Sequence, residues 1–276
     1  MKPPFPYIGS KQRLLKRLVL PNIPEHVYYG EVFGGSAAVL LSKPISQIEV
    51  YNDINSEVVN FYRMLRESQD ELTRLLLFTP YSREEYEKAF YISEEDSSLE
   101  RARKFFVRAR MGIAGLQNAS TSFGMSVTLI RRNIPATCSR YLSSIDGFEE
   151  VTARLSKVQF ENIDFRRFFR IYISKWNDTD PEQTFVYLDP PYIRNVPKED
   201  INIMYQNDTY TEEDDDQLLE LITKIYPSVR YMISHYDNEK YNQILHSWRK
   251  VCIEIKTTSA RKSRNRSRVE CIWMNF

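Results

Sequence analysis

The sequence is poor in cysteine, almost without net charge, and free of long apolar runs. Its 276 residues include three cysteines, which are Cys138, Cys252 and Cys271. Because they are odd in number and widely spaced, they indicate neither a disulfide framework nor a CxxC metal site, and a reducing cytosol is the natural compartment. No apolar stretch approaches the ~20 residues of a membrane span, and no apolar signal-peptide core follows Met1. We therefore expect a soluble, cytoplasmic protein.

The 38 Lys and Arg residues almost balance the 37 Asp and Glu residues, so the formal charge is only +1. This balance argues neither for nor against nucleic acid, because polyanion binding depends on local clusters of basic residues. Clusters occur at 101–110, 131–132 and 261–268, and an acidic run at 212–216 offsets them. A charge run usually marks a solvated surface, but we favour contact with a phosphate backbone. The candidate DNA-binding residues are Arg108, Arg110, Arg131, Arg132, Arg261, Lys262 and Arg264.

The apolar content of 42% and the charged content of 27% are those of a globular protein. Seven segments have the composition of strands, and helical patterns separate most of them. These segments are 27–33, 48–53, 158–164, 184–188, 231–236, 251–256 and 269–276. The alternation predicts an α/β fold with a seven-stranded, doubly wound sheet.

Between 69 and 155 the strand pattern disappears and short helical patterns replace it. The basic segment after Ser98 has apolar residues at helical spacing, which predicts an apolar inner face and an arginine-rich outer face. We interpret 69–155 as an inserted, mainly helical module that contacts DNA. Segments 1–68 and 156–276 then form the domain that contains the sheet.

The segment Thr184–Leu188 is followed by Asp189, Pro190, Pro191 and Tyr192. Prolines cannot continue a sheet ladder, so the carbonyl groups of Asp189 and Pro190 are free to point into a cleft. A carboxylate, free carbonyls and an aromatic ring at the end of a central strand suit the binding of a planar amino group. The alternative is that the two prolines merely end a strand.

A small-residue turn at 34–38 follows the first predicted strand and opens a predicted helix through 39–41. Such a turn lets backbone N–H groups approach a nucleotide, although many αβ units have one for packing alone. Asp53 ends the next strand about 20 residues later, the spacing at which a carboxylate contacts ribose. Asp53 could instead assist Asn55 in capping the following helix.

Three further residues are candidates for a ligand site. Tyr7 and Lys11 bracket a glycine turn in a proline-rich arm, where a ring and an amine could line a pocket, although a single lysine is more often solvated. Asp164 ends a strand, so it could accept a hydrogen bond from an adenine or simply cap the next helix.

Six motifs occur in the order found in a known family. They are Pro4-Phe5-Pro6-Tyr7-x-Gly9-Ser10-Lys11, Phe33-x-Gly35-Ser36-Ala37, Asn52-Asp53-Ile54-Asn55, Asp164-Phe165, Asp189-Pro190-Pro191-Tyr192 and Val269 to Phe276. Over nearly its whole length the chain resembles the Dam-type N6-adenine DNA methyltransferases of phages and bacteria. The resemblance implies methyl transfer from S-adenosylmethionine to N6 of adenine in double-stranded DNA, without a metal ion.

The resemblance also implies individual roles. Tyr7 and Lys11 contact the methionine end of the cofactor, Asp53 the ribose and Asp164 the cofactor's adenine. The residues implied at the cofactor are Tyr7, Lys11, Phe33, Gly34, Gly35, Ser36, Ala37, Asp53, Asp164 and Asp189, and those implied at the target base are Asp189, Pro190, Pro191 and Tyr192.

Two departures from the family pattern matter. Ala37 replaces the last glycine of a Phe-x-Gly-x-Gly turn, which puts a backbone contact to the cofactor in doubt. The segment 69–155 lacks the Asn-rich signature of GATC-specific members, so the sequence does not identify the recognition site, and it does not indicate the oligomeric state.

The lone pair of the adenine amino nitrogen is delocalised into the ring, so this nitrogen is a poor nucleophile. Hydrogen bonds to the Asp189 carboxylate and the Pro190 carbonyl would favour its pyramidal form while Tyr192 stacks on the base. In a duplex the nitrogen is paired and stacked, so the hypothesis includes extrusion of the base.

Three other functions remain open at this point. An RNA base methyltransferase would use the same Asp-Pro-Pro-Tyr tetrapeptide. A nicotinamide oxidoreductase shares the glycine turn and the Asp53 spacing, but it has no use for the tetrapeptide. A catalytically inactive DNA-binding module on the same fold is the non-enzymatic alternative.

Overall fold

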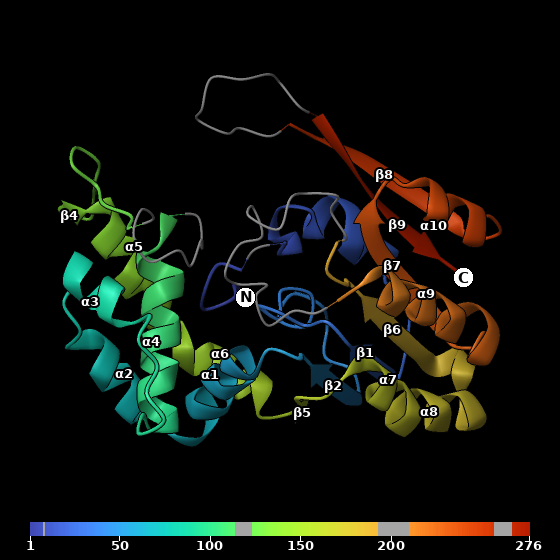
Figure 1. The fold of residues 1–276 in the computed structure, drawn as a ribbon, viewed down its shortest axis with the longest axis horizontal. Coiled ribbons are helices and arrows are strands. Elements are labelled where there is room, and N and C mark those ends of the chain that lie inside the picture. The colour runs from blue at the N-terminus through green and yellow to red at the C-terminus, as the bar shows by residue number, and fades with distance from the viewer. Residues whose placement is uncertain (8, 114–122, 193–209, 257–266) are drawn as a thin grey trace.

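The computed structural model describes residues 1–7, 9–113, 123–192, 210–256 and 267–276, and its centre is a seven-stranded sheet in the order β5-β2-β1-β6-β7-β9-β8 (Figure 1). The strands are β1 (Tyr28–Glu31), β2 (Ile48–Asn52), β5 (Gln159–Glu161), β6 (Thr184–Leu188), β7 (Arg230–Tyr236), β8 (Arg249–Lys256) and β9 (Ser267–Met274). Neighbouring strands are parallel, except that β9 is antiparallel to β7 and β8. The predicted seven-stranded α/β fold is confirmed.

Strand β6 lies in the middle of the sheet, and all five of its residues are buried. Phe185 and Tyr187 belong to the core on one face, whereas Val186 and Leu188 belong to the core on the other. The chain proceeds from β1 through β2 to β5 and then returns to β6 beside β1, so the strand order reverses between β1 and β6. Ligands of open α/β sheets bind at the carboxyl ends of the strands beside such a reversal.

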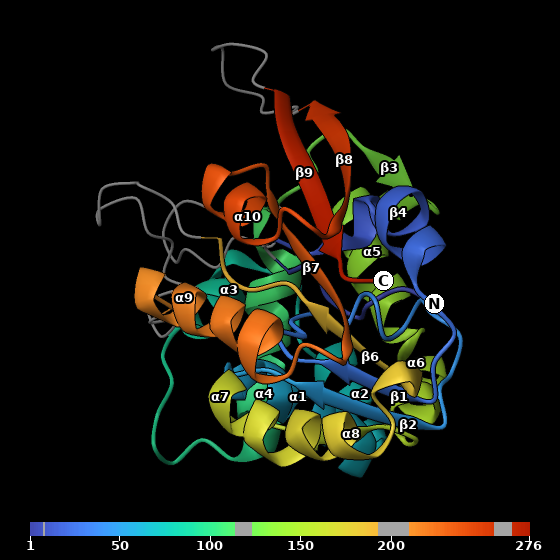
Figure 2. The same cartoon turned by 90° about the vertical axis from the view of Figure 1, so that its right-hand side faces the viewer.

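Helices cover both faces of the sheet (Figures 1 and 2). One face packs on Phe168, Trp176 and Leu218. These side chains belong to a layer made of α7 (Phe165–Phe168), α8 (Ser174–Thr179), α9 (Glu212–Glu220) and α10 (Glu239–Ile244). The opposite face packs on the helical turns from 11 to 22 and on α1 (Ser56–Glu67), whose first turn is capped by the Asn55 side chain.

The α-helix predicted to begin at the glycine turn does not form. Residues 35–42 make successive turns, in which the Leu41 N–H donates to the Ala37 carbonyl at 2.9 Å. Ala37 has a φ of 53°, and a residue in this left-handed region interrupts a right-handed helix. The prediction was wrong because the apolar pattern of 39–41 does not reveal the handedness of the backbone.

The segment 69–155 packs on α1 at the left of Figure 1. It contains α2 (Gln69–Leu77), α3 (Arg83–Lys88), α4 (Ser98–Met111), α5 (Ala136–Ile145), α6 (Phe148–Leu155) and a hairpin of β3 (Ile130–Arg131) with β4 (Ile134–Pro135). Phe61 of α1 stacks on Phe106 of α4 at 5.6 Å and meets Phe148 of α6 edge-on at 6.0 Å. Phe5 of the N-terminal arm enters the same cluster, 4.9 Å from Phe105. The segment therefore shares one aromatic core with α1 and the arm.

The outward, arginine-rich face predicted for α4 is wrong for Arg108 and Arg110. Arg108 is 6% exposed, and its Nη1 donates to the Ala89 carbonyl at 2.6 Å. Arg110 is half-buried, and its Nε donates to the Pro4 carbonyl at 2.7 Å. These guanidinium groups connect α4 to neighbouring segments and do not form the predicted outward face.

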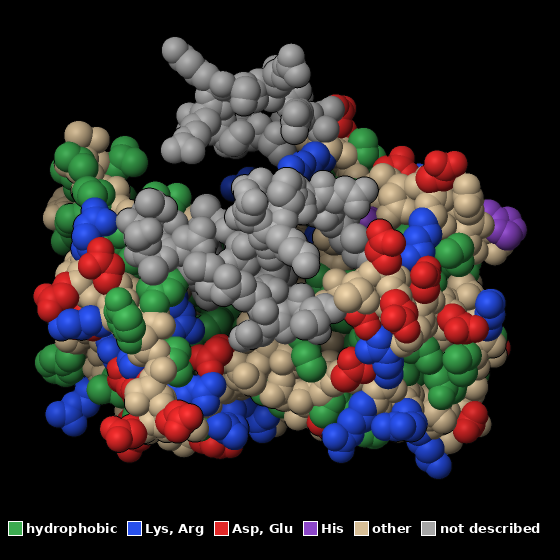
Figure 3. All heavy atoms as spheres, viewed as in Figure 1, with side chains coloured by type: hydrophobic (Ala, Val, Ile, Leu, Met, Phe, Trp, Pro, Cys, Tyr) green, Lys and Arg blue, Asp and Glu red, His purple; other side chains and the backbone are tan. Residues whose placement is uncertain are grey.

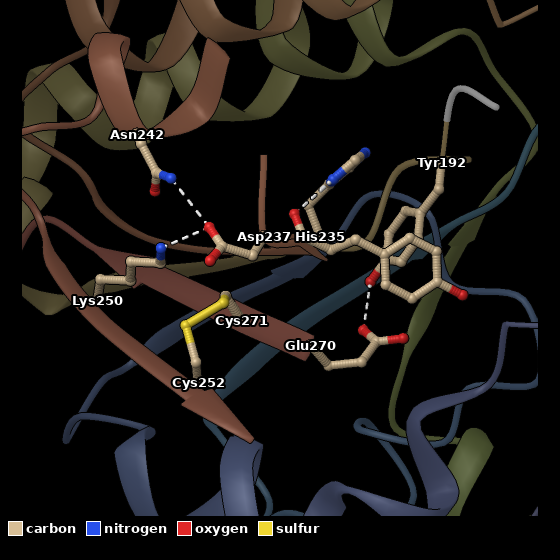
Figure 4. Close-up of a disulfide and its surroundings, with 9 residues drawn as sticks. Tyr192, His235, Asp237, Asn242, Lys250, Cys252, Glu270 and Cys271 are labelled. Carbon is tan, nitrogen blue, oxygen red and sulfur yellow. Dashed lines mark hydrogen bonds and ion pairs between the residues drawn. A yellow bond between two sulfur atoms is a disulfide. The ribbon is translucent and has the colours of Figure 1, made fainter. Parts of the chain in front are cut away.

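The cysteines also differ from the prediction. Cys252 and Cys271 occupy paired positions on β8 and β9 and form a disulfide bond (Figure 4). They are 19 residues apart in the sequence, and the hairpin that makes them neighbours is not visible in their spacing. Cys138 is a free thiol. Within the described ranges, no helix has the length and apolar character to cross a membrane.

Candidate active site

The sheet ladders of β6 end at Leu188, so the following residues leave the sheet at its carboxyl edge. Asp189 comes first, and its Oδ1 accepts a hydrogen bond from Lys11 Nζ at 2.7 Å. The two side chains are 15% and 4% exposed, respectively. Burial raises the pKa of Asp189, and the ammonium group of Lys11 opposes that rise. The structure thus joins two predicted site residues that are 178 positions apart.

Tyr192 turns back toward the ends of β7 and β9 (Figure 4). Its hydroxyl group donates to Glu270 Oε2 at 3.0 Å, and its ring centre lies 4.4 Å from that of His235. Lys11 Nζ lies 4.5 Å from the centre of the same ring. The sequence analysis did not single out Glu270. Its position could have indicated a function, because it is an acidic residue within the otherwise apolar strand of the terminal motif.

The turn after β1 lies between the N-terminal arm and the end of β2. Gly35 has a φ of 49°, and a Cβ at this position would lie 2.9 Å from the Tyr7 ring. Asp53 Oδ2 accepts a hydrogen bond from the Gly35 N–H at 2.6 Å. Ser10 Oγ from the arm lies 3.1 Å from Ser36 Oγ. The arm, the turn and Asp53 therefore form one connected structure, as a shared ligand site requires.

Asp53 and Asp164 also have the structural roles that the sequence left open. Asp53 Oδ1 accepts from the Asn55 N–H at 2.8 Å, which supports the start of α1. Asp164 Oδ1 accepts from the Arg166 N–H at 2.8 Å, so Asp164 caps α7. Arg166 also forms an ion pair with the Asp164 carboxylate at 2.9 Å.

A pocket opens beside the turn, at the carboxyl ends of β1, β2 and β5. Phe33, Ile54 and Phe165 line it with apolar surface, and Asp164 and Tyr210 add polar groups. Asn52, Arg166 and Asp214 also line the pocket, so its wall is about equally apolar and polar. Aromatic and aliphatic side chains beside hydrogen-bonding groups suit a flat heterocycle with polar edges.

Two other groups of predicted residues belong to the candidate DNA interface. Arg131 and Arg132 are exposed at the β3–β4 hairpin. Arg261, Lys262 and Arg264 lie outside the described residues. Among the residues that the structure describes, no cluster of three or more His, Cys, Asp or Glu side chains could hold a metal ion.

The seven-stranded, mostly parallel sheet and its strand reversal are those of an α/β fold of the methyltransferase class. Residues 7–262 match the D12 class of N6 adenine-specific DNA methyltransferases, and the chain belongs to this family. A Type II methyltransferase of Lactococcus lactis subsp. cremoris, M1.LlaDCHI, is 25% identical to this chain over an alignment of 290 positions. The alignment covers 100% of this chain and 96% of the relative. The chain is thus an adenine-specific DNA methyltransferase, and enzymes of this kind use S-adenosylmethionine as methyl donor.

Ala37 provides a first prediction. It is buried with a left-handed backbone, a conformation that costs alanine roughly 1–2 kcal/mol and glycine almost nothing. Ala37→Gly relieves this strain and so offsets the loss of the methyl group. We expect it to be about 1 kcal/mol less destabilising than Ala38→Gly, measured by urea unfolding. If Ala37→Gly and Ala38→Gly lose the same free energy of unfolding, the backbone at Ala37 is not strained.

Glu31 provides a prediction about pH. The side chain is buried at the end of β1, and its Oε2 accepts from the Tyr29 hydroxyl at 2.7 Å and from the Leu40 N–H at 2.8 Å. Burial outweighs both hydrogen bonds and raises the pKa of Glu31 to about 8. The folded state then binds more protons than the unfolded state between pH 4.5 and 8, so its stability falls as the pH rises through this window.

Glu31→Gln keeps an acceptor for both donors and removes the titration. We expect its free energy of unfolding, relative to the unchanged protein, to increase between pH 5 and pH 8 by on the order of a few kcal/mol. Urea unfolding at both pH values measures this difference. A difference that is the same at both values would show that Glu31 does not titrate in this range.

Proposed function

We propose that Asp189, Lys11 and the Gly34–Ala37 turn surround the point where the methyl group of S-adenosylmethionine meets N6 of an adenine extruded from double-stranded DNA. The observation that carries this proposal is the Lys11–Asp189 ion pair at the end of the central strand, beside the strand reversal. It brings the two halves of the sequence pattern, the arm and the Asp-Pro-Pro-Tyr segment, into one corner.

The residues at this corner fit the proposed cofactor. Gly35 approaches the Tyr7 ring closely, and we place the methionine end of the cofactor beside this contact. The pocket between Ile54 and Phe165 suits the adenine, with Asp164 at its edge. Asp53 connects the turn to the end of β2, between these two regions, where the ribose would lie.

The proposed chemistry depends on hydrogen-bond acceptors at the edge of the sheet. When bound, S-adenosylmethionine supplies a methyl group on a positively charged sulfur. The Asp189 carboxylate and the Pro190 carbonyl accept hydrogen bonds from the two N6 protons, so the nitrogen lone pair points toward the methyl group. Pro191 fixes the chain direction, and Tyr192 contributes an aromatic surface for the base. The protein acts mainly by alignment and electrostatics.

The substrate is tested directly with purified protein and isotopically labelled S-adenosylmethionine. We expect N6-methyladenine in duplex DNA, detected by mass spectrometry of the nucleosides, and far less label in structured RNA offered in competition. Preferential labelling of RNA would overturn the choice of duplex DNA. Sequencing of the methylated product then identifies the recognition site.

The β3–β4 hairpin is the described surface that best fits a DNA interface. Arg132 and Asn133 at its tip both have positive φ angles, which is typical of a tight hairpin turn. Leu129 and Ile130 are 67% and 76% exposed, and Figure 3 shows hydrophobic side chains gathered on this projecting part of the molecule, at the upper left. Exposed apolar side chains beside arginines suit contact with base edges between two phosphate contacts. We propose that Arg131 and Arg132 bind the DNA backbone.

Arg131→Ala and Arg132→Ala are each expected to weaken DNA binding several-fold at 0.1 M salt, because each removes about one phosphate contact. The slope of log K against log salt should decrease in magnitude by about 1 for each variant, as measured by fluorescence anisotropy. Lys224→Ala is the matched control, because this side chain is 74% exposed and lies in the helical turn that follows α9, outside 69–155. If the salt slope of Lys224→Ala changes as much as the slopes of the two arginine variants, the hairpin is not a specific DNA interface.

We further propose that 69–155 is the DNA-recognition module and that 1–68 with 156–276 is the catalytic domain. The helices and the hairpin of the first segment, and the sheet of the second, support this division. A cytoplasmic location fits an enzyme whose substrate is DNA. The Type II name of the Lactococcus relative favours a role in restriction and modification.

A further inference from the structure

We propose that Glu270 is a positioning residue of the methyl-transfer site, which fixes Tyr192 and supplies a negative charge that favours the charged cofactor over its neutral product. The inference rests on the proposed function of the Asp189 corner. Glu270 is 7% exposed and comes from β9, far in sequence from the other residues of the site. Its side chain points toward Tyr192 in Figure 4.

The first contact of Glu270 fixes the aromatic ring. Its Oε2 accepts the Tyr192 hydroxyl at 3.0 Å, while His235 and Tyr236 pack on the ring at 4.4 and 4.7 Å between ring centres. A ring held by its hydroxyl and by two aromatic neighbours has little rotational freedom, so the base meets a preorganised surface. Without the carboxylate, the hydroxyl of Tyr192 would lose this acceptor.

The second contact concerns charge. Lys11 Nζ lies 2.7 Å from the Asp189 carboxylate and 3.8 Å from the Glu270 carboxylate. With all three groups charged, this buried corner has one negative charge in excess. A buried excess charge is unfavourable unless a cation joins it. S-adenosylmethionine has a sulfonium charge, and S-adenosylhomocysteine has a neutral thioether in its place. The corner should therefore discriminate between substrate and product cofactor by charge.

Calorimetric binding of both cofactors to the full-length protein tests the charge. Glu270→Gln keeps the size and an acceptor oxygen but removes the charge, so we expect S-adenosylmethionine to bind about tenfold more weakly and S-adenosylhomocysteine less than threefold more weakly. Glu254→Gln, an exposed carboxylate on the neighbouring β8, is the matched control and should leave both affinities unchanged. Equal losses for both ligands, or no loss for either, would overturn the proposal.

Glu270→Asp provides an independent check, because it retains the charge but shortens the side chain. We expect it to preserve the preference for S-adenosylmethionine even if it binds both ligands more weakly. Loss of the preference in Glu270→Asp would show that the charge of residue 270 is not its source. This variant also serves if Glu270→Gln does not fold.

A double-mutant cycle tests the contact with Tyr192. Tyr192→Phe keeps the ring and removes the hydroxyl group, and Glu270→Ala removes the acceptor of that hydroxyl. We expect each of these two variants to lower kcat about tenfold. If they act on one hydrogen bond, the double variant loses little more than the worse single variant. If the double variant instead loses kcat by the product of the two single losses, the two side chains act independently, and the positioning role is refuted. A wild-type protein that does not bind S-adenosylmethionine would instead refute the proposed function itself, so the two failures are distinguishable.

Discussion

Asp189→Ala is expected to reduce kcat for adenine methylation by at least about 10³-fold while DNA binding remains within about threefold of the original. The change removes the charged acceptor for the N6 protons, and preorganised groups of this kind contribute a large share of enzymatic rate enhancement. It also leaves Lys11, which is 4% exposed, without its 2.7 Å partner. Single-turnover methyl transfer and fluorescence anisotropy with the same DNA measure the two effects.

Asp189→Asn separates geometry from charge, because it keeps one acceptor oxygen at the same position. We expect an intermediate loss of kcat. Asp178→Ala, an exposed acid shortly before β6, is the control and should have full activity. Turnover of Asp189→Ala within tenfold of the original would remove this carboxylate from the reaction.

Gly34→Ala is expected to destabilise the protein by about 3 kcal/mol, near the upper end of the usual cost of overpacking. A Cβ at this position would lie 2.0 Å from Cε2 of Tyr51, a distance at which atoms must move. The Tyr51 ring cannot yield easily, since it is fully buried and its hydroxyl donates to the Gly35 carbonyl at 2.6 Å. Phe160 lies against the same ring, with centres 4.9 Å apart. Urea unfolding measures the loss.

Gly147→Ala is the matched control for this substitution. The nearest atom to a Cβ at Gly147 is the Ser144 carbonyl oxygen at 3.8 Å, which is an ordinary contact. We expect a change of less than about 1 kcal/mol there. If both variants are equally stable, the turn has more freedom than its contacts indicate.

Sequence reasoning succeeded where one segment determines its own environment. The run Thr184–Leu188 is apolar throughout and ends at two prolines, so both the buried central strand and the exit of the chain at Asp189 follow from local rules. The turn at Gly34 and the position of Asp53 are also local features. The distance between them in the sequence is that of two neighbouring parallel strands and their connection. In the structure, the Gly35 N–H of this turn donates a hydrogen bond to Asp53.

Sequence reasoning failed where distant segments decide. Nothing in the helical spacing of α4 distinguishes Arg108, which donates to the Ala89 carbonyl, from an arginine in solvent. The pairing of Cys252 with Cys271 depends on the register of β8 against β9. Glu270 has a place in the site only because β9 inserts next to β7, an arrangement that follows from topology and not from spacing.

The first residues of the chain limit how recognition specificity can be exchanged between relatives. Phe5 is 2% exposed inside the aromatic cluster of α1 and α4, and Arg110 of α4 donates to the Pro4 carbonyl. Six residues further on, the same arm presents Lys11 to Asp189. A chimeric enzyme that receives only a foreign 69–155 segment would therefore have mismatched contacts between that segment and the arm that carries Lys11. Grafts that also carry the donor's first six residues should retain more activity.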